Sequence, residues 1–224
     1  MTKKIMILAG CMLVSLAISD AKAFWIGGYG AYPDGGDVKN NDTGYGLEAG
    51  GRIDDTFSLE VSGTHFSDTI AGMDVDVTTL AVTGLAGVDV IKDTARLYVG
   101  AGLDYNMFNS SADILEIAAA SKGMSVDQYA TANGTSGAAL RSILQSEGFS
   151  ADVRFQDSVG YHVCAGTVVN LNEGFQIFAQ YRYTWAKVKG DISFTEFGQT
   201  TIEKNAVDAD YKFGLLMAGI NIIL

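Results

Sequence analysis

The sequence predicts an all-β fold, namely an eight-stranded antiparallel up-and-down transmembrane β-barrel with a partly helical long extracellular third loop. Three features predict this fold. Segments of about ten residues alternate between apolar and small or polar residues, aromatic residues stand near the segment ends, and long and short connections follow one another in turn. Because successive side chains of a strand point to opposite faces, each segment is expected to have one apolar wall.

The segment 95–107 alternates most clearly, with Val99 and Leu103 on one face and Gly100 and Gly102 on the other. The same alternation predicts strands at residues 24–32, 44–53, 57–66, 74–91, 95–107, 153–169, 175–188 and 211–224. Aromatic side chains are expected near the membrane interfaces at Trp25, Tyr45, Phe57, Tyr105, Tyr161, Tyr181, Trp185 and Phe213.

The fourth expected strand is the least regular. Val75 and Val77 are in phase with each other but out of phase with Leu80 and Val82. A β-bulge near Thr78–Thr79 would reconcile the two phases, and we therefore expect one there.

The connections indicate how the barrel is oriented. Three are short, at residues 54–56, 92–94 and 170–174, and four are longer, at residues 33–43, 67–73, 108–152 and 189–210. Outer-membrane barrels have short periplasmic turns and longer extracellular loops. The alternation predicts a protein of the outer membrane of a Gram-negative bacterium, with both termini in the periplasm.

The first residues predict export. Residues 1–23 have a basic start, an apolar run over 5–18 and a small-x-small cleavage site at 21–23, which is the pattern of a cleaved signal peptide. Residues 24–224 are then a single outer-membrane barrel domain. The apolar run is too short for a membrane-spanning helix. Leu8–Cys11 spells a lipoprotein-type cleavage box, an alternative in which lipid would be attached to the cysteine.

Charge restricts the expected partners. Removing the signal removes three lysines and one aspartate, which leaves 12 basic and 25 acidic residues and a formal charge of −13. Nucleic acid is therefore not an expected partner. A closed barrel has no free edge to pair, so a monomer is expected. Cys164 remains alone in the mature chain, so no intramolecular disulfide is expected.

The composition of the face opposite the apolar wall distinguishes two interpretations, a membrane barrel and a soluble lipocalin-like barrel. In the soluble barrel the apolar face would point inward. A solvent-facing wall would be rich in charge, yet here Gly, Ser, Thr and Gln dominate. The isolated charges form an expected lumen network of Glu48, Glu60, Arg96, Asp104, Arg182 and Lys212. Because buried unpaired charges are costly and eight strands leave an interior that side chains can fill, these groups are expected to pair as an ionic plug.

Glu48, Glu60 and Arg182 are the first candidates for one such network. The alternative is a narrow wet channel, for which the small inward-facing residues would be Gly100, Gly102, Gly160 and Gly166. Arg182→Ala would change conductance in a channel, whereas in a plugged barrel it would mainly destabilise the fold.

Two histidines are candidate reactive groups. His65 and Ser67 share a strand face and could act as base and nucleophile, as in an outer-membrane lipid A deacylase, but no acidic partner is identifiable, so a polar pair at the rim is expected. His162 faces inward and is expected to be a hydrogen-bonded filler. The outer-loop aspartates lack the spacing of a calcium loop. We expect no enzyme, no cofactor and no metal site.

Four stretches, residues 24–32, 44–51, 97–103 and 180–183, together resemble the small outer-membrane β-barrels of the OmpA/OmpX and opacity-protein type, often called the porin family. The resemblance implies an outer-membrane β-barrel domain surrounded by outer-membrane lipid and lipopolysaccharide. Leu224 departs from the family, which usually ends in an aromatic residue that is recognised during insertion.

The third loop, residues 108–152, is too long to be only a connection. Ile114, Ile117 and Ala118 have helical spacing, Ser125–Gln128 resembles a capping box, and a second apolar stripe ends at Gly148. The expected recognition lobe comprises Ile114, Ile117, Tyr129, Leu140 and Leu144. These residues could pack on the barrel mouth, bind an extracellular protein or host ligand, or do both.

The expected function is that of a non-catalytic outer-membrane β-barrel. It would contribute to envelope integrity and, through its extracellular loops, to surface interaction or adhesion. The alternative is a narrow porin-like channel for ions or small solutes.

Overall fold

The computed structural model describes residues 23–39, 42–70, 73–110, 114–197 and 199–224. Nearly all of the expected signal peptide at 1–23, including the Leu8–Cys11 box, lies outside these residues. The described strands are β1 (Ala23–Gly36), β2 (Gly44–Arg52), β3 (Phe57–Ile70), β4 (Met73–Ile91), β5 (Ala95–Ser110), β6 (Ser150–Gln156), β7 (Ser158–Asn170), β8 (Phe175–Glu196) and β9 (Gln199–Ile223). The described helices are α2 (Ile114–Ser121), α3 (Val126–Ala132) and α4 (Gly137–Ser146).

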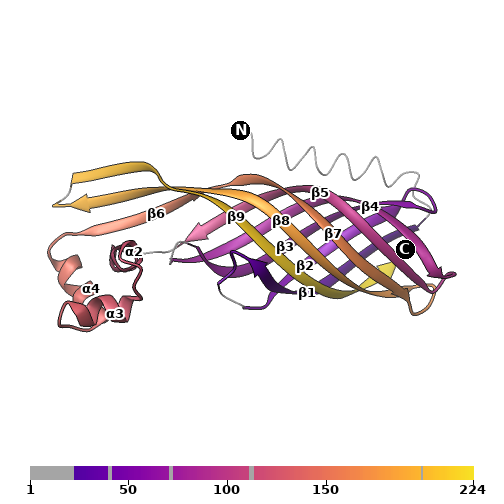
Figure 1. Cartoon of the computed structure of the whole chain (residues 1–224), viewed down its shortest axis with the longest axis horizontal. Helices are drawn as coiled ribbons and strands as arrows, with labels where there is room; N and C mark the ends of the chain where they lie inside the picture. The colour runs from indigo at the N-terminus through magenta and orange to yellow at the C-terminus, as the bar shows by residue number, and fades with distance from the viewer. Residues whose placement is uncertain (1–22, 40–41, 71–72, 111–113, 198) are drawn as a thin grey trace.

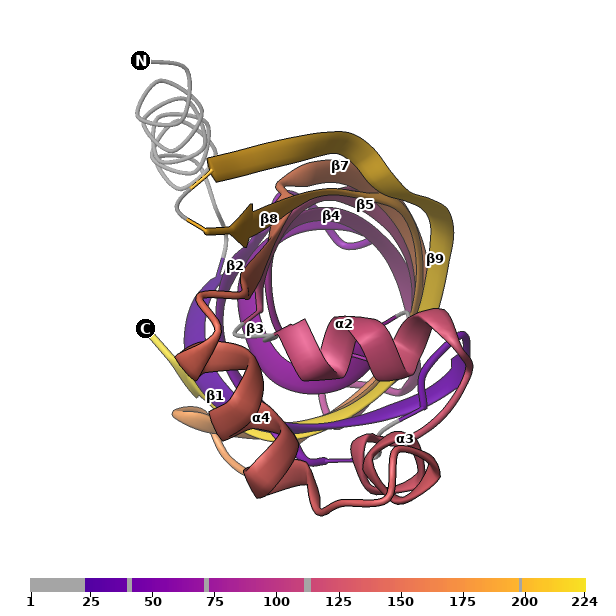
Figure 2. The same cartoon turned by 90° about the vertical axis from the view of Figure 1, so that its left-hand side faces the viewer.

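The strands close into an antiparallel barrel. Neighbours in the sequence pair from β1 to β5, β5 then pairs with β7, and β7, β8 and β9 continue in order. The ring closes where Trp25 of β1 pairs with Ile223 of β9. Figure 2 looks along the resulting cylinder. The predicted eight-stranded up-and-down barrel is confirmed, because β6 lies outside this ring and pairs with β8 alone.

The two ends of the barrel differ. The short turns after β2, β4 and β7 lie at the end where β1 begins and β9 finishes, and we call this the turn end (Figure 1). The opposite end, called the loop end, has the β1–β2 connection, the β5–β6 connection and the extension described next. The strands lean steeply relative to the long axis, as barrel closure requires.

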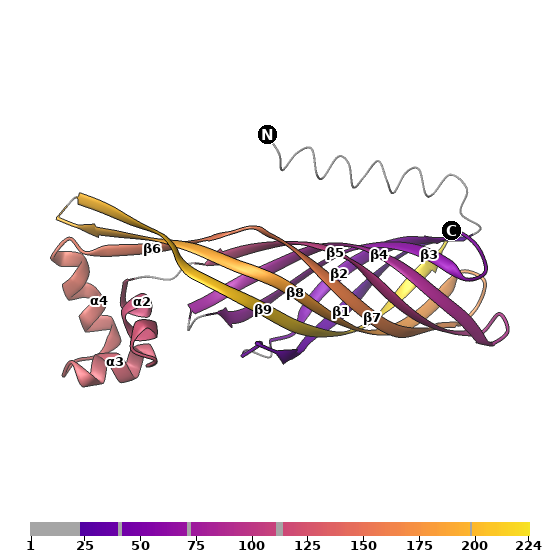
Figure 3. The same ribbon diagram turned by 45° about the horizontal axis from the view of Figure 1, so that its top comes forward.

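Two segments expected to be loops are strands instead. β3 and β4 run through most of residues 67–73, and β8 and β9 continue through most of 189–210. β6, β8 and β9 thereby form a three-stranded extension beyond the loop end (Figure 3). The prediction of a loop at 189–210 was wrong because the extension packs apolar residues such as Val188 on one side only. Its sequence is therefore as polar as that of a loop.

The bulge expected at Thr78–Thr79 is absent from β4. β3 and β4 pair in continuous register, and the shift lies between Asp89 and Ile91 in the pairing of β4 with β5. Val75 and Val77 point into the barrel, whereas Leu80 and Val82 are exposed on its outside. Apolar residues can occupy both faces of β4 without a bulge, because the part of the barrel interior that Val75 and Val77 face is itself apolar.

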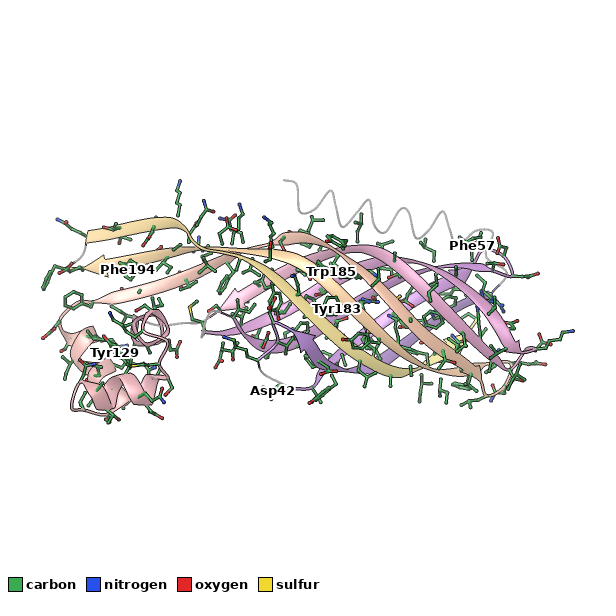
Figure 4. The ribbon with its side chains drawn as sticks, in the orientation of Figure 1. Asp42, Phe57, Tyr129, Tyr183, Trp185 and Phe194 are labelled. Atoms are coloured by element: carbon green, nitrogen blue, oxygen red, sulfur yellow. The ribbon has the colours of Figure 1, made fainter. Side chains whose placement is uncertain are left out.

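The outside of the barrel carries a belt of exposed apolar side chains. Its members come from every ring strand and include Ile26, Tyr45, Leu47, Val82, Val99, Leu103, Tyr161, Val163, Ile177, Leu216 and Ile220. Tyr161 stacks on Trp185 with ring centroids 5.2 Å apart, and Figure 4 shows Trp185 beside Tyr183 on the barrel wall. So large an apolar surface is unfavourable in water and matches the lipid-facing band of a transmembrane barrel.

The third loop contains three short helices, which confirms the prediction that it is partly helical. The Ser125 side chain accepts a hydrogen bond from the backbone of Gln128, and the Gln128 side chain accepts one from the backbone of Ser125, which forms the expected capping box of α3. α2 lies across the barrel mouth in the end-on view (Figure 2). Within the described ranges, no helix combines the length and the apolar character needed to cross a membrane.

Candidate functional site

The barrel lumen is the candidate functional site, and its half nearer the turn end is polar. Alternation along the strands turns their small and polar residues inward, where they are buried. The main members of this polar half are Glu48, Glu60, Ser62, Thr83, Asp104, His162, Gln180, Arg182 and Asn221.

Arg182 is the only fully buried arginine within the described residues, and its side chain crosses the lumen to β3. Its Nη2 donates hydrogen bonds to Oε1 of Glu60 at 3.1 Å and to Oγ of Ser62 at 3.0 Å. Glu48, which the sequence groups with this pair, instead accepts a hydrogen bond from Nδ2 of Asn221 at 2.8 Å. The structure therefore joins two of the three grouped residues directly.

Asp104 binds a histidine rather than a lysine or arginine. Its Oδ1 lies 2.9 Å from Nδ1 of His162, and Nε2 of the same ring lies 2.9 Å from Oγ1 of Thr83. All three side chains are buried. His162, expected to be a hydrogen-bonded filler, has both ring nitrogens hydrogen-bonded. Sequence reasoning missed its partners because they depend on the register of β5 against β4 and β7.

Arg96 lies at the turn end. Its guanidinium donates to the carbonyl oxygens of Asp55 and Thr56, and it contacts Asp89 at 3.3 Å. Arg52 reaches the same Asp89 carboxylate at 3.4 Å. These contacts tie together the turns after β2 and β4, so Arg96 belongs to the rim and not to the group around Arg182.

Lys212 does not belong to the lumen network, so this part of the prediction was wrong. It is exposed on the outside of the barrel opposite Trp185, and its backbone N–H donates to Oδ2 of Asp37. Tyr211 and Phe213 on either side of it point inward. The sequence assigned Lys212 to the lumen on the premise that polar residues face inward, and that premise fails at the loop end.

The half of the lumen nearer the loop end is mostly apolar, and Asp68, a carboxylate buried there, accepts a hydrogen bond from the Tyr211 hydroxyl at 2.6 Å. Phe66 and Phe213 contact each other with ring centroids 5.3 Å apart, and Tyr211 packs on Phe213 at 5.2 Å. Ile117 of α2 joins the same cluster from the mouth. Its other large members are Tyr29, Ile70, Met73, Val75, Val77, Phe108, Val153, Phe155, Phe178, Val188, Leu215 and Met217. Phe213, expected at a membrane interface, is a fully buried part of this interior plug.

In the helical lobe, residues 114–146, the two apolar stripes expected from the sequence are partly buried. Ile117 is buried, and the other residues expected to form the recognition surface, Ile114, Tyr129, Leu140 and Leu144, are half-buried. The large apolar side chains most exposed on the lobe are Met124 and Ile143. The expected residues therefore lie closer to the interior of the lobe than to its surface.

His65 and Ser67 each bind a residue of β4. Nδ1 of His65 lies 3.0 Å from Oγ1 of Thr78, and Oγ of Ser67 donates to Asp76 at 2.8 Å. A base and its nucleophile need a hydrogen bond to each other. The contacts found here instead link two neighbouring strands at the rim.

The four inward glycines lie beneath larger side chains. A Cβ on Gly102 would lie 2.5 Å from Cε1 of His162, and one on Gly166 would lie 2.5 Å from the hydroxyl of Tyr98. Gly100 and Gly160 are similarly close to Cys164 and Asn106. These glycines leave room for neighbouring side chains to cross the lumen.

Gly102→Ala is expected to lower the free energy of unfolding by about 1–3 kcal/mol, because the new methyl group would overpack a filled interior. It would also lie 2.1 Å from the carbonyl oxygen of Val82, which is backbone. Urea unfolding in detergent measures the change. Gly30→Ala is the control, since no atom lies within 4 Å of a Cβ built there. Equal stabilities for the two variants would contradict the prediction.

A closed ring of antiparallel strands with an apolar outer belt and a largely polar lining defines the class of transmembrane β-barrels. The family model described as outer membrane protein beta-barrel domain matches residues 6–213, and the chain belongs to this family. No curated protein matches the sequence.

Two solved structures show the same fold. The chain is similar to OprG, an outer membrane protein of Pseudomonas aeruginosa, at 17% identity, with a TM-score of 0.59 and coverage of 92% of this chain and 97% of OprG. It is also similar to Neisserial surface protein A at 17% identity, with a TM-score of 0.54 and coverage of 89% and 96%.

Proposed function

We propose that this protein is a non-catalytic outer-membrane barrel that contributes to envelope integrity and presents its loop end for surface interaction or adhesion. The observation that carries the proposal is a lumen crossed by side chains in both halves, with Arg182 bound to Glu60 in one and Phe66 against Phe213 in the other. An eight-stranded barrel is just wide enough for side chains to fill. Side chains that cross the lumen in both halves favour a structural and display function over transport.

The connections support the proposed orientation. The short turns lie at the same end of the barrel as the start of β1 and the finish of β9, as they do at the periplasmic face of outer-membrane barrels. In the proposed orientation the turn end faces the periplasm and the loop end faces the cell exterior. The lipid-facing belt lies against outer-membrane lipid and lipopolysaccharide, and the closed ring supports a monomer.

The surface that other molecules would meet is the lobe together with the β6–β8–β9 extension. Tyr129 marks the lobe and Phe194 the extension in Figure 4. Phe197, at the tip of the extension, is 74% exposed, and Ile202 is 58% exposed. Exposed apolar side chains outside a membrane often mark contact sites, which favours an extracellular protein or a host ligand as the partner. One structural neighbour is itself named a surface protein.

The lobe residues have a supporting place in this proposal. Ile117 packs in the apolar cluster of the barrel, and Ile114, Tyr129, Leu140 and Leu144 are half-buried, while the exposed Met124 and Ile143 are available for contact. A lobe already folded into helices would bind with a smaller loss of conformational entropy than a flexible loop.

Single-channel recording in planar bilayers tests the proposal. The chain without residues 1–23 is compared with a second form that also lacks residues 111–149, which join β5 to β6. No conductance from either form is the expected result. Steady conductance from the longer form would overturn the plugged barrel and establish the narrow channel. Conductance only after the deletion would make the lobe a gate.

The display function needs a separate measurement. Bacteria producing the full chain are compared with bacteria producing the form without residues 111–149 for attachment to host cells. Loss of attachment with equal surface amounts is expected. Equal attachment by the two strains would contradict a recognition function for the lobe.

A further inference from the structure

A cavity of about 580 Å³ opens at the turn end and reaches into the polar half of the lumen. Trp25, Tyr98 and Phe178 form part of its wall, and Glu48 and Glu60 lie on it as well. Its volume falls within the range of sites that hold small molecules. Among the described residues, Glu60 of the Arg182 contact lines this cavity, whereas Phe66 and Phe213 of the other half do not.

The two carboxylates on the cavity wall are buried and only partly neutralised. Glu48 is 4% exposed and Glu60 is 3% exposed. Arg182 bonds to Oε1 of Glu60, whereas the hydrogen bond to Glu48 comes from the neutral amide of Asn221. Oε2 of Glu48 is buried without a close hydrogen bond among the described residues, and the Trp25 indole that acts on the same carboxylate is a neutral donor. A buried carboxylate oxygen without a donor is costly, so this position favours a ligand that supplies a positive charge and N–H donors.

The charged groups at the rim do not neutralise Glu48. Arg52 and Arg96 both contact Asp89, and Arg96 also binds two backbone carbonyls of the turn after β2. The cavity wall also includes the acidic residues Asp93 and Glu173. The acidic residues Asp89, Asp93 and Glu173 outnumber Arg52 and Arg96 on the wall at this end, so a cation entering there would meet a net negative charge.

The remaining wall is suited to an alkyl group. Leu85, Phe178 and Val168 supply apolar surface, and Trp25 and Tyr98 supply aromatic rings. Aromatic rings attract ammonium groups as well as alkyl chains. A divalent metal ion would prefer a larger set of oxygen ligands than these two carboxylates.

We propose that the turn-end cavity binds a small organic cation that has a primary ammonium group on an alkyl chain. The ammonium group donates hydrogen bonds to Glu48, and the chain lies against the wall formed by Trp25, Tyr98 and Phe178. In the proposed orientation this ligand enters from the periplasm. Binding does not require a path through the barrel, because the cavity and the apolar plug occupy opposite halves of the lumen.

The chain contains two tryptophans, Trp25 and Trp185, which permits a direct optical test. Trp185→Phe leaves Trp25 as the only tryptophan. This variant, without residues 1–23, is refolded in zwitterionic detergent and titrated with n-butylammonium chloride at constant ionic strength. A saturable change in Trp25 fluorescence is expected. n-Butanol, which is similar in size but uncharged, is expected to give no saturable change over the same concentrations.

Glu48→Gln in the same background is expected to weaken n-butylammonium binding at least tenfold. The matched control is Glu203→Gln, since Glu203 is exposed on the extension at the other end of the molecule. Any of three results would overturn the proposal: no saturable response of Trp25, an equal response to n-butanol, or equal affinity in the Glu48→Gln variant. The comparison of amine with alcohol needs no change at Glu48, so it decides the matter even if that variant does not fold.

Discussion

Arg182→Met is expected to lower the free energy of unfolding by about 3–5 kcal/mol, because it leaves the Glu60 carboxylate buried without its partner. Arg182 is fully buried, and its guanidinium binds both Glu60 and Ser62. Methionine fills much of the same volume, so lost packing contributes little. The measurement is the midpoint of urea unfolding in detergent or lipid.

A double variant separates charge from volume. Arg182→Met combined with Glu60→Gln removes both charges, and it is expected to recover a large part of the lost stability, because replacing both members of a buried pair costs less than removing one. Unchanged unfolding midpoints in both variants would contradict an ionic plug. A large change in conductance with unchanged stability would favour the channel instead.

Phe213→Ala is expected to cost about 3–5 kcal/mol, since it opens a void in a packed interior. Phe213 is fully buried between Phe66 and Tyr211. The matched variant is Leu216→Ala, which shortens a side chain that is 51% exposed on the lipid-facing side of the same strand. Urea unfolding of the two variants is compared under identical conditions. If Leu216→Ala cost as much as Phe213→Ala, the apolar plug would not be a core.

Much of the fold could be predicted because a lipid-facing strand has a strong period of two. Val99 and Leu103 face outward from β5, as their alternation indicates. The capping box at Ser125 and Gln128 is local in the sequence and was equally readable. These signals arise within single segments, which is why they need no knowledge of the three-dimensional arrangement.

The interior at the loop end could not be predicted in this way. Val75, Val77 and Phe213 are apolar and point inward, whereas Lys212 is charged and points outward. An alternating pattern shows that a strand has two faces, but it does not show which face lies inside the barrel. Polar residues face inward in most of this barrel, whereas apolar residues face inward where the barrel contains an apolar cluster. The same ambiguity produced the unneeded bulge in β4.

The candidate site was partly predictable for a related reason. Burial requires a partner for Arg182, and few acidic residues face the lumen, so Glu60 was a reasonable choice. The contact between Asp104 and His162 depends on how β5 and β7 are aligned. The long helical connection separates these strands in the chain, and no sequence rule sets their alignment across it.

The seam between β1 and β9 has a consequence for assembly. It pairs the first described strand with the last, for example Trp25 with Ile223, so the ring closes only when nearly the whole chain is present. Contacts between residues so distant in the sequence form slowly, because the entropy of closing a long loop is lost first. Until β9 is in place, β1 and β8 expose unpaired backbone groups that invite aggregation. A barrel built this way depends on protection of its unfinished edges during delivery to the membrane.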